Sequence, residues 1–180
     1  MPAISLYRFA RNEGEAARSP RRSLLRLLAD AKRLAKRYYA LTGRPLGITG
    51  EVAEWEAVRL LRLRPAQVRQ PGYDAEGKGP NGRKEQLQIK GRCIIGKFKP
   101  GARMGAIDLT KPWDAVLLVL LNGDFEATAI YRADRSAVRA ALLAPGSKAR
   151  NKRRQLSIAK FKTIGRRVWP GDGRAARGKG

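Results

Sequence analysis

The stretch from Ala115 to Leu121, AVLLVLL, contains no polar side chain. It is too short to cross a bilayer as a helix, which takes about 20 apolar residues. An unbroken apolar run of this length is typical of a β-strand buried on both faces, because a strand with one wet face alternates apolar and polar residues. The chain is therefore expected to fold around a sheet that is covered on both sides.

Two helices are predicted before this strand and two after it. Helical spacing covers 21–41, with the apolar stripe Leu24, Leu28, Ala31, Ala35 and Tyr38. The next helix has Thr49 as its N-cap, runs to Pro65 and buries Val52, Trp55, Val58 and Leu61. Later, Asp134 is expected to cap the short helix RSAVRAALL, and SIAKFKTIG forms a last helix that docks Ile158, Phe161 and Ile164.

Alternating residues and turn signals predict the remaining strands. AQVRQPGYDA indicates a short strand and a bend, and Gly79 to Gly82 forms a turn. KEQLQIKGRCII then alternates, with Leu87 and Ile89 on one side. Asn122-Gly123 predicts a hairpin whose return strand is FEATAIYRA. This order predicts an α/β or α+β domain with a mixed central sheet of about four strands, flanked by helices.

The chain of 180 residues suits one compact domain with extensions. Residues 1–20 are expected to form a flexible N-terminal arm, 21–165 a single domain with its core at 46–143, and 166–180 a basic disordered tail.

The net charge of the chain indicates the class of molecule that it binds. The 39 Lys and Arg residues against 15 Asp and Glu give a net charge of +24, which draws polyanions from a distance, so nucleic acid is the expected partner. The first residues lack the apolar stretch of a signal peptide, and the single cysteine, Cys93, suits a reducing cytosol and a buried packing role. These features predict a cytoplasmic, nucleoid-associated protein with no membrane partner.

The chain has no histidine. This excludes histidine-based zinc sites, Ser-His-Asp hydrolysis and nuclease sites in which a histidine activates water. Any chemistry on nucleic acid must therefore rest on carboxylates, lysine and a hard cation.

Four residues are candidates for such a site. Asp74 is expected just after a strand that precedes a turn, and Gln88 and Lys90 are two apart on the following strand, so they face the same way, toward Asp74. Glu51 opens the preceding helix and can join them if that helix packs on this face.

The segments GITGEVAEWEAVRLL, PGYDA and QLQIKGR resemble the helix-Glu, Asp, (Asp/Glu/Gln)-x-Lys order of the PD-(D/E)XK nuclease superfamily, which includes many restriction enzymes and Holliday-junction resolvases. The likeness covers roughly 46–131 and extends to bacterial and phage proteins of that fold. It implies a restriction-endonuclease-like fold, a Mg²⁺-dependent phosphodiesterase activity, a DNA rather than RNA substrate, and a homodimer.

The resemblance also assigns roles. Asp74 and the backbone carbonyl of Ile89 would bind one or two Mg²⁺ or Mn²⁺ ions, and Lys90 would position or deprotonate the attacking water. Gln88 stands where an acid is commoner, and its amide oxygen lacks the charge of a carboxylate. Glu51 is expected to compensate as a further ligand, with Glu54 as the second choice.

Basic residues around this site and near the C-terminus are candidates for phosphate contacts: Arg92, Lys97, Lys99, Arg103, Lys111, Lys148, Arg150, Lys152 and Arg153. Such contacts fix the position of a nucleic acid without reading its sequence, and part of this set can be ordinary surface charge.

Every candidate also has a structural explanation. Asp74 can hold a turn, Gln88 and Lys90 can form the solvated face of an edge strand, and Glu51 can complement the helix dipole. The whole chain can likewise be a DNA- or RNA-binding protein that keeps a nuclease-like fold without catalysis.

Overall fold

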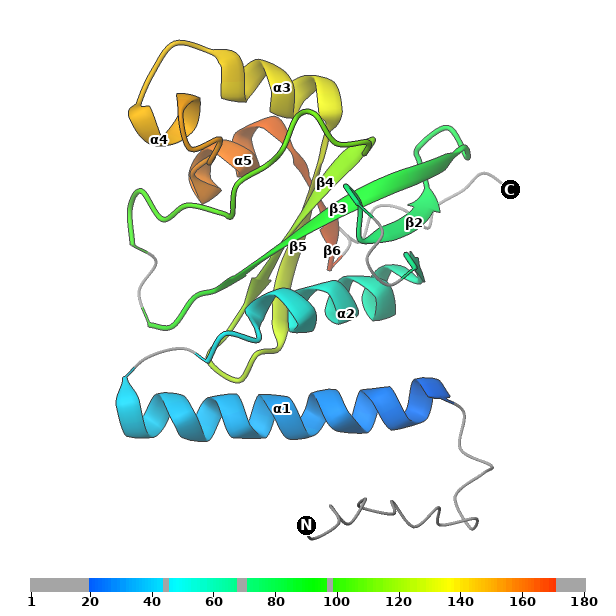
Figure 1. Cartoon of the computed structure of the whole chain (residues 1–180), viewed down its shortest axis with the longest axis vertical. Helices are drawn as coiled ribbons and strands as arrows, with labels where there is room; N and C mark the ends of the chain where they lie inside the picture. The colour runs from blue at the N-terminus through cyan, green and yellow to red at the C-terminus, as the bar shows by residue number, and fades with distance from the viewer. Residues whose placement is uncertain (1–19, 44–45, 68–70, 97–98, 171–180) are drawn as a thin grey trace, which may run out of the picture.

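A mixed six-stranded sheet runs through the molecule, with its strands side by side in chain order (Figure 1). The computed structural model describes residues 20–43, 46–67, 71–96 and 99–170. Only β3 and β4 pair in parallel, and every other neighbouring pair in the described chain is antiparallel. The architecture is therefore α+β. The strands are β1 (Arg64–Pro65), β2 (Ala75–Lys78), β3 (Lys84–Cys93), β4 (Ala115–Leu121), β5 (Ala127–Asp134) and β6 (Arg166–Trp169).

Strand β4 is buried along its whole length, as its apolar run predicts. Leu117 and Val119 belong to the core on one face of the sheet, whereas Leu118 and Leu120 belong to the core on the other. Period-2 alternation sends successive side chains to opposite faces, so both faces need a cover. Helices α2 (Thr49–Leu61) and α1 (Pro20–Thr42) lie on one side of the sheet, and α3 (Arg135–Leu143), α4 (Lys148–Asn151) and α5 (Ile158–Ile164) on the other (Figure 1).

Helix α2 packs directly on β3, and Gly91 makes this close approach possible. A Cβ atom on Gly91 would lie 2.5 Å from Cβ of Ala53 and 2.7 Å from the carbonyl oxygen of Thr49, so no larger residue fits without moving the helix. Thr49 is the first helical residue rather than the predicted N-cap, and Ile48 occupies the cap position. The helix buries Val52 and Val58 as predicted, together with Ala53, Glu56 and Ala57, while Trp55 and Leu61 are half-buried.

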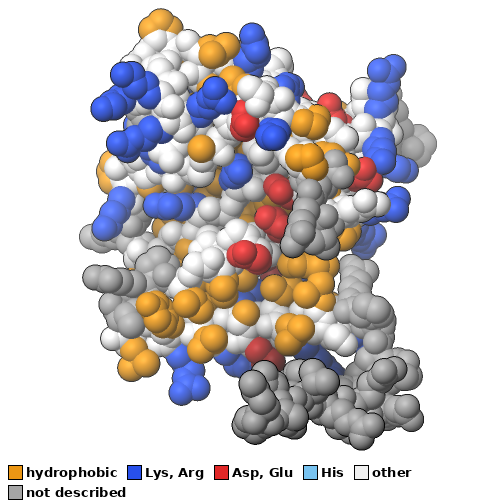
Figure 2. All heavy atoms as spheres, in the orientation of Figure 1, with side chains coloured by type: hydrophobic (Ala, Val, Ile, Leu, Met, Phe, Trp, Pro, Cys, Tyr) orange, Lys and Arg blue, Asp and Glu red, His pale blue; other side chains and the backbone are white. Residues whose placement is uncertain are grey.

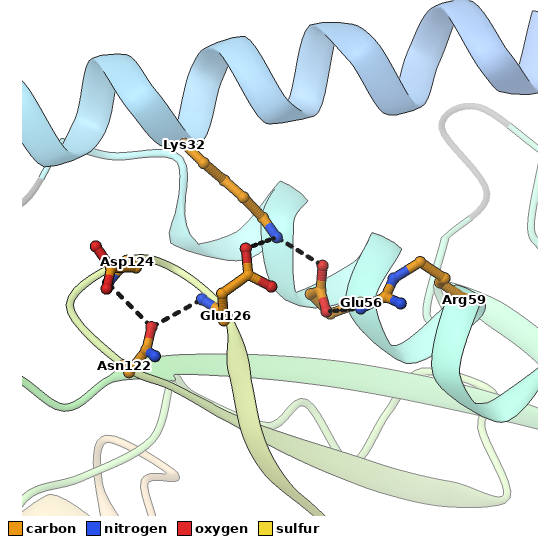
Figure 3. Close-up of polar contacts among 6 residues, drawn as sticks. All are labelled: Lys32, Glu56, Arg59, Asn122, Asp124 and Glu126. Carbon is orange, nitrogen blue, oxygen red and sulfur yellow. Dashed lines mark hydrogen bonds and ion pairs between the residues drawn. The ribbon is translucent and has the colours of Figure 1, made fainter.

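Helix α1 forms an outer layer that a polar network fastens to α2 and to the β4–β5 hairpin (Figure 3). Lys32 donates to Glu56 at 2.8 Å and to Glu126 at 2.9 Å, and Arg59 pairs with Glu56 at 2.7 Å. Glu56 is only 5% exposed, so these two cations compensate a buried charge. The apolar stripe faces inward at Ala35, which is fully buried, whereas Tyr38 at its end is exposed.

The β4–β5 hairpin forms where Asn122-Gly123 predicts it, but its loop spans 122–126. The side-chain oxygen of Asn122 accepts hydrogen bonds from the N–H groups of Asp124 and Glu126, both at 2.9 Å. On the opposite side of the sheet, α5 buries Ile158 and Phe161 as predicted, and Ile164 is half-buried. Asp134 precedes α3, yet its carboxylate pairs with Arg132 at 2.7 Å and makes no cap hydrogen bond.

The sheet differs from the prediction at its edges. Three of the about four expected strands correspond to β3, β4 and β5, but the strand expected within AQVRQPGYDA was wrong, because only its last residue, Ala75, lies in a described strand. Strands β1, β2 and β6 were missed, and the residues of β1 and β6 are exposed or partly exposed. Strand β6 also extends the domain beyond the expected boundary at 165. The expected arm lies outside the described residues except for Pro20, as does the tail from 171 onward. No helix in the described ranges is long and apolar enough to cross a bilayer.

Candidate active site

Asp74 lies immediately before β2, not after a strand as the sequence suggested, because the preceding strand ends at Pro65. Its backbone N–H donates to the Leu87 carbonyl at 2.9 Å, which fixes it beside β3. Its Oδ2 accepts the N–H of Ile89 at 2.7 Å. In an extended strand the N–H and C=O of one residue point the same way, so the Ile89 carbonyl faces the same edge as Asp74.

Gln88 is 8% exposed, and only part of its amide is satisfied. Nε2 donates to the carbonyl of Gly72 at 3.4 Å, two residues before Asp74. Oε1 is buried and has no hydrogen-bond partner in the described structure. A buried acceptor without a partner costs free energy, so this oxygen is suited to a ligand that supplies positive charge.

Lys90 is half-buried beside the long loop that joins β3 to β4. Its Cδ would lie 3.6 Å from a Cβ atom placed on Gly105 of that loop. Strand β2 pairs with β3 only as far as Leu87, so at Gln88 and Lys90 the strand has a paired neighbour, β4, on one side only. Gln88 is nonetheless buried and Lys90 is half-buried, so the two do not form a fully solvated face.

Glu54, on the second turn of α2, is half-buried, while Glu51 is exposed on the first turn. Burial, followed by the charges of Asp74 and Glu51, raises the pKa of Glu54 to about 7, and the charge of Lys90 opposes this rise. Because such interactions weaken with distance and solvent screening, Asp74, Glu51 and Lys90 each lie near Glu54. The structure thus places these three charged groups around Glu54.

The acids of this cluster differ from most other acids of the described chain in their ion pairing. Glu51, Glu54 and Asp74 form no salt bridge with any described residue, although the chain is rich in cations. Asp114 is also unpaired, but its Oδ2 accepts the N–H of Gln86 at 2.7 Å and so joins β3 to the start of β4. All remaining acids of the described chain have a lysine or arginine partner: Asp30, Glu56, Glu76, Glu85, Asp108, Asp124, Glu126 and Asp134.

Figure 2 shows acidic side chains (red) in the middle of one face of the molecule, with lysine and arginine side chains (blue) above and to the left of them. Hydrophobic side chains (orange) lie below, over α1 and α2. A small negative area next to positive charge is the pattern expected for a cation site that faces a polyanion.

Several oxygens at this place can serve a hard cation such as Mg²⁺, which takes carboxylate, amide and carbonyl ligands. They are the carboxylates of Asp74 and Glu54, the partnerless Oε1 of Gln88 and the carbonyl of Ile89. Among the described residues, no group of three or more histidine, cysteine, aspartate or glutamate side chains is arranged to hold a metal ion. A site here would therefore depend on the amide and carbonyl oxygens as well as the carboxylates.

The basic candidates divide into two groups. Arg103 donates to the Gln155 carbonyl at 3.2 Å and to Ser147 Oγ at 3.3 Å, and Arg150 donates to the carbonyl of Pro145, so both have partners within the fold. Lys97 lies outside the described residues. The others are exposed: Arg92, Lys99, Lys111, Lys148, Lys152 and Arg153.

Comparison of the chain with protein-family models and with curated proteins finds no match.

Proposed function

We propose that this protein is a Mg²⁺-dependent phosphodiesterase that cuts nucleic acid, a DNA endonuclease of the PD-(D/E)XK type with a restriction-endonuclease-like fold. The observation that carries the proposal is the unpaired carboxylate cluster beside Lys90. A chain of net charge +24 has ample cations to neutralise three carboxylates, yet these three have no ion pair with any described residue. Such an arrangement costs stability and is typical of functional sites.

Asp74, Glu54, the Oε1 atom of Gln88 and the Ile89 carbonyl would hold the cation. Glu54 replaces Glu51 as the proposed ligand from the helix, because it is half-buried and senses the charges of both Asp74 and Lys90. A bound Mg²⁺ supplies charge stabilisation for the phosphoryl oxygens and lowers the pKa of water.

Lys90 is the remaining functional group of the site. Its ammonium group donates hydrogen bonds and would hold the attacking water or a phosphate oxygen in place. The surrounding exposed cations would fix the phosphate backbone against the site, independently of base sequence. No step requires histidine, in keeping with its absence from the sequence.

The test is cleavage of supercoiled, linear, branched and single-stranded DNA with Mg²⁺ or Mn²⁺. Wild-type protein should cut at least one substrate, and Asp74→Ala and Lys90→Ala should each lose about a hundredfold or more in rate, as loss of a metal ligand or charge-stabilising group does. Asp30→Asn and Lys160→Ala remove exposed charges of the same kind elsewhere and should cut at the wild-type rate. Equal activity of Asp74→Ala and wild type would overturn the proposal.

A non-catalytic nucleic-acid-binding protein is the second candidate. The amide at position 88 favours it, since an amide binds a divalent ion more weakly than a carboxylate does. If wild-type protein binds every DNA form without cutting any, and Asp74→Ala binds equally well, this second function replaces the first.

A further inference from the structure

A pocket of about 370 Å³ opens where the end of α1, the first turn of α2 and the end of β3 meet the loop that follows β3. Its walls include Tyr39, Arg92, Ile94, Ile95 and Lys99. The volume falls in the range of small-ligand pockets, about 300–1,000 Å³.

Two residues of the pocket lining are close in sequence to residues of the carboxylate cluster. Gly91, the next residue after Lys90, lines the pocket, and so does Thr49, two residues before Glu51. A nucleic-acid strand with one phosphate at the cluster would therefore place a neighbouring nucleotide near the mouth of this pocket.

The lining has the chemistry of a nucleotide site. Arg92 and Lys99 are exposed cations with no salt bridge to any described residue, and no acidic residue lines the pocket. Tyr39, Ile94 and Ile95 supply an aromatic ring and apolar surface. Cations that track a backbone phosphate, combined with an aromatic ring on which a base can stack, are typical of single-strand binding sites.

We propose that this pocket holds one unpaired nucleotide next to the point of cleavage, with its phosphate on Arg92 and Lys99 and its base against Tyr39. The position of the nucleotide relative to the cut rests on the proposed function, whereas its capture by the pocket does not. A base paired within a duplex cannot enter a pocket without leaving the stack. The substrate class is therefore nucleic acid with a single-stranded segment, such as an overhang, a flap or an open strand.

Cys93 provides the test, because it lines the pocket, is half-buried and is the only cysteine in the sequence. Its alkylation by a maleimide is timed at one pH without divalent cations, alone and with a single-stranded oligonucleotide or the blunt duplex of the same sequence. The single strand should slow labelling several-fold, and the duplex at the same fractional occupancy should not. Equal protection by both, or by neither, would overturn the proposal.

Variants link the protection to the lining. Arg92→Ala/Lys99→Ala should abolish protection of Cys93 by the single strand, and Tyr39→Ala should weaken single-strand affinity about tenfold while duplex affinity holds. Lys160→Ala/Arg139→Ala removes two exposed cations elsewhere and should keep the protection. Unchanged protection in Arg92→Ala/Lys99→Ala would count against the pocket. Labelling of Cys93 is measured without any cleavage of nucleic acid. A protein that binds a single strand in this pocket but cuts no DNA would therefore still show the expected protection.

Discussion

Glu54 titrates near neutral pH because burial and the neighbouring carboxylates raise its pKa to about 7 from the usual 4.5. As the pH rises, Glu54 loses its proton at a lower pH in the unfolded chain than in the folded chain. The stability that neutral Glu54 contributes is therefore complete below pH 4.5 and is lost as the pH rises through about 7. Glu54→Gln stays neutral throughout. Relative to wild type it should gain roughly 1 kcal/mol between pH 5 and pH 8, well below the full value of the shift because the side chain is partly exposed.

The measurement is urea unfolding of wild type and Glu54→Gln at both pH values without divalent ions. Asp30→Asn removes an exposed carboxylate on α1 and controls for the change in net charge. An identical difference between Glu54→Gln and wild type at the two pH values would show that Glu54 is not perturbed in the folded chain.

Residue types and spacing made Asp74, Gln88 and Lys90 candidates, since alternation along β3 predicts which side chains share a face. They could not rank Glu54 above Glu51. The rotation of α2 on the sheet decides which glutamate is half-buried, and it depends on the close contact between Ala53 and Gly91. That contact joins distant parts of the chain, and no local pattern encodes it.

At the scale of elements, Gly91 controls how close α2 lies to β3. Gly91→Ala would force the helix outward from the 2.5 Å approach to Ala53, and we expect a loss of about 1–3 kcal/mol, as in other overpacked cores. Gly50→Ala is the matched control, because no atom lies within 4 Å of its added methyl group. Alanine there should leave stability unchanged or raise it by up to about 1 kcal/mol. Denaturant unfolding compares the two, and equal effects would contradict the packing argument.

The attachment of α1 depends on Lys32, which compensates buried Glu56 (Figure 3). Lys32→Met leaves Arg59 as the single described partner of Glu56, and we expect a loss of about 2 kcal/mol in unfolding free energy. Arg33→Met, one position along, breaks an exposed pair with Asp30 and should cost under about 0.5 kcal/mol. Lys32→Met/Glu56→Met should recover most of the loss, because no unpaired buried charge remains. A double variant as unstable as Lys32→Met would show that packing, not charge, holds α1.

Helices and strands with a clear hydrophobic pattern or turn signal could be predicted from the sequence. Segments without such a signal could not. The apolar run of β4, the turn before β3 and the helix around Phe161 are local signals, and the structure confirms them. Strands β1 and β6 are short edge strands that form because a neighbour offers free backbone groups. The sequence of such a segment carries little periodicity, which explains why the tail was expected to begin at Arg166.

At the scale of the whole molecule, the net charge of +24 should make DNA binding steeply dependent on salt. The slope of log K against log salt concentration should fall by about 0.9 for each phosphate contact removed. Changing Lys148, Lys152 and Arg153 to Gln tests whether the exposed cations on and after α4 contact DNA. Changing Arg22, Arg26 and Arg37 of α1 to Gln removes the same charge from the outer layer on the opposite side of the sheet. Both triple variants lose equal long-range attraction, so a larger drop in slope for the first indicates direct contact. Identical slopes for the two would mean that the cations near α4 act only through the overall field.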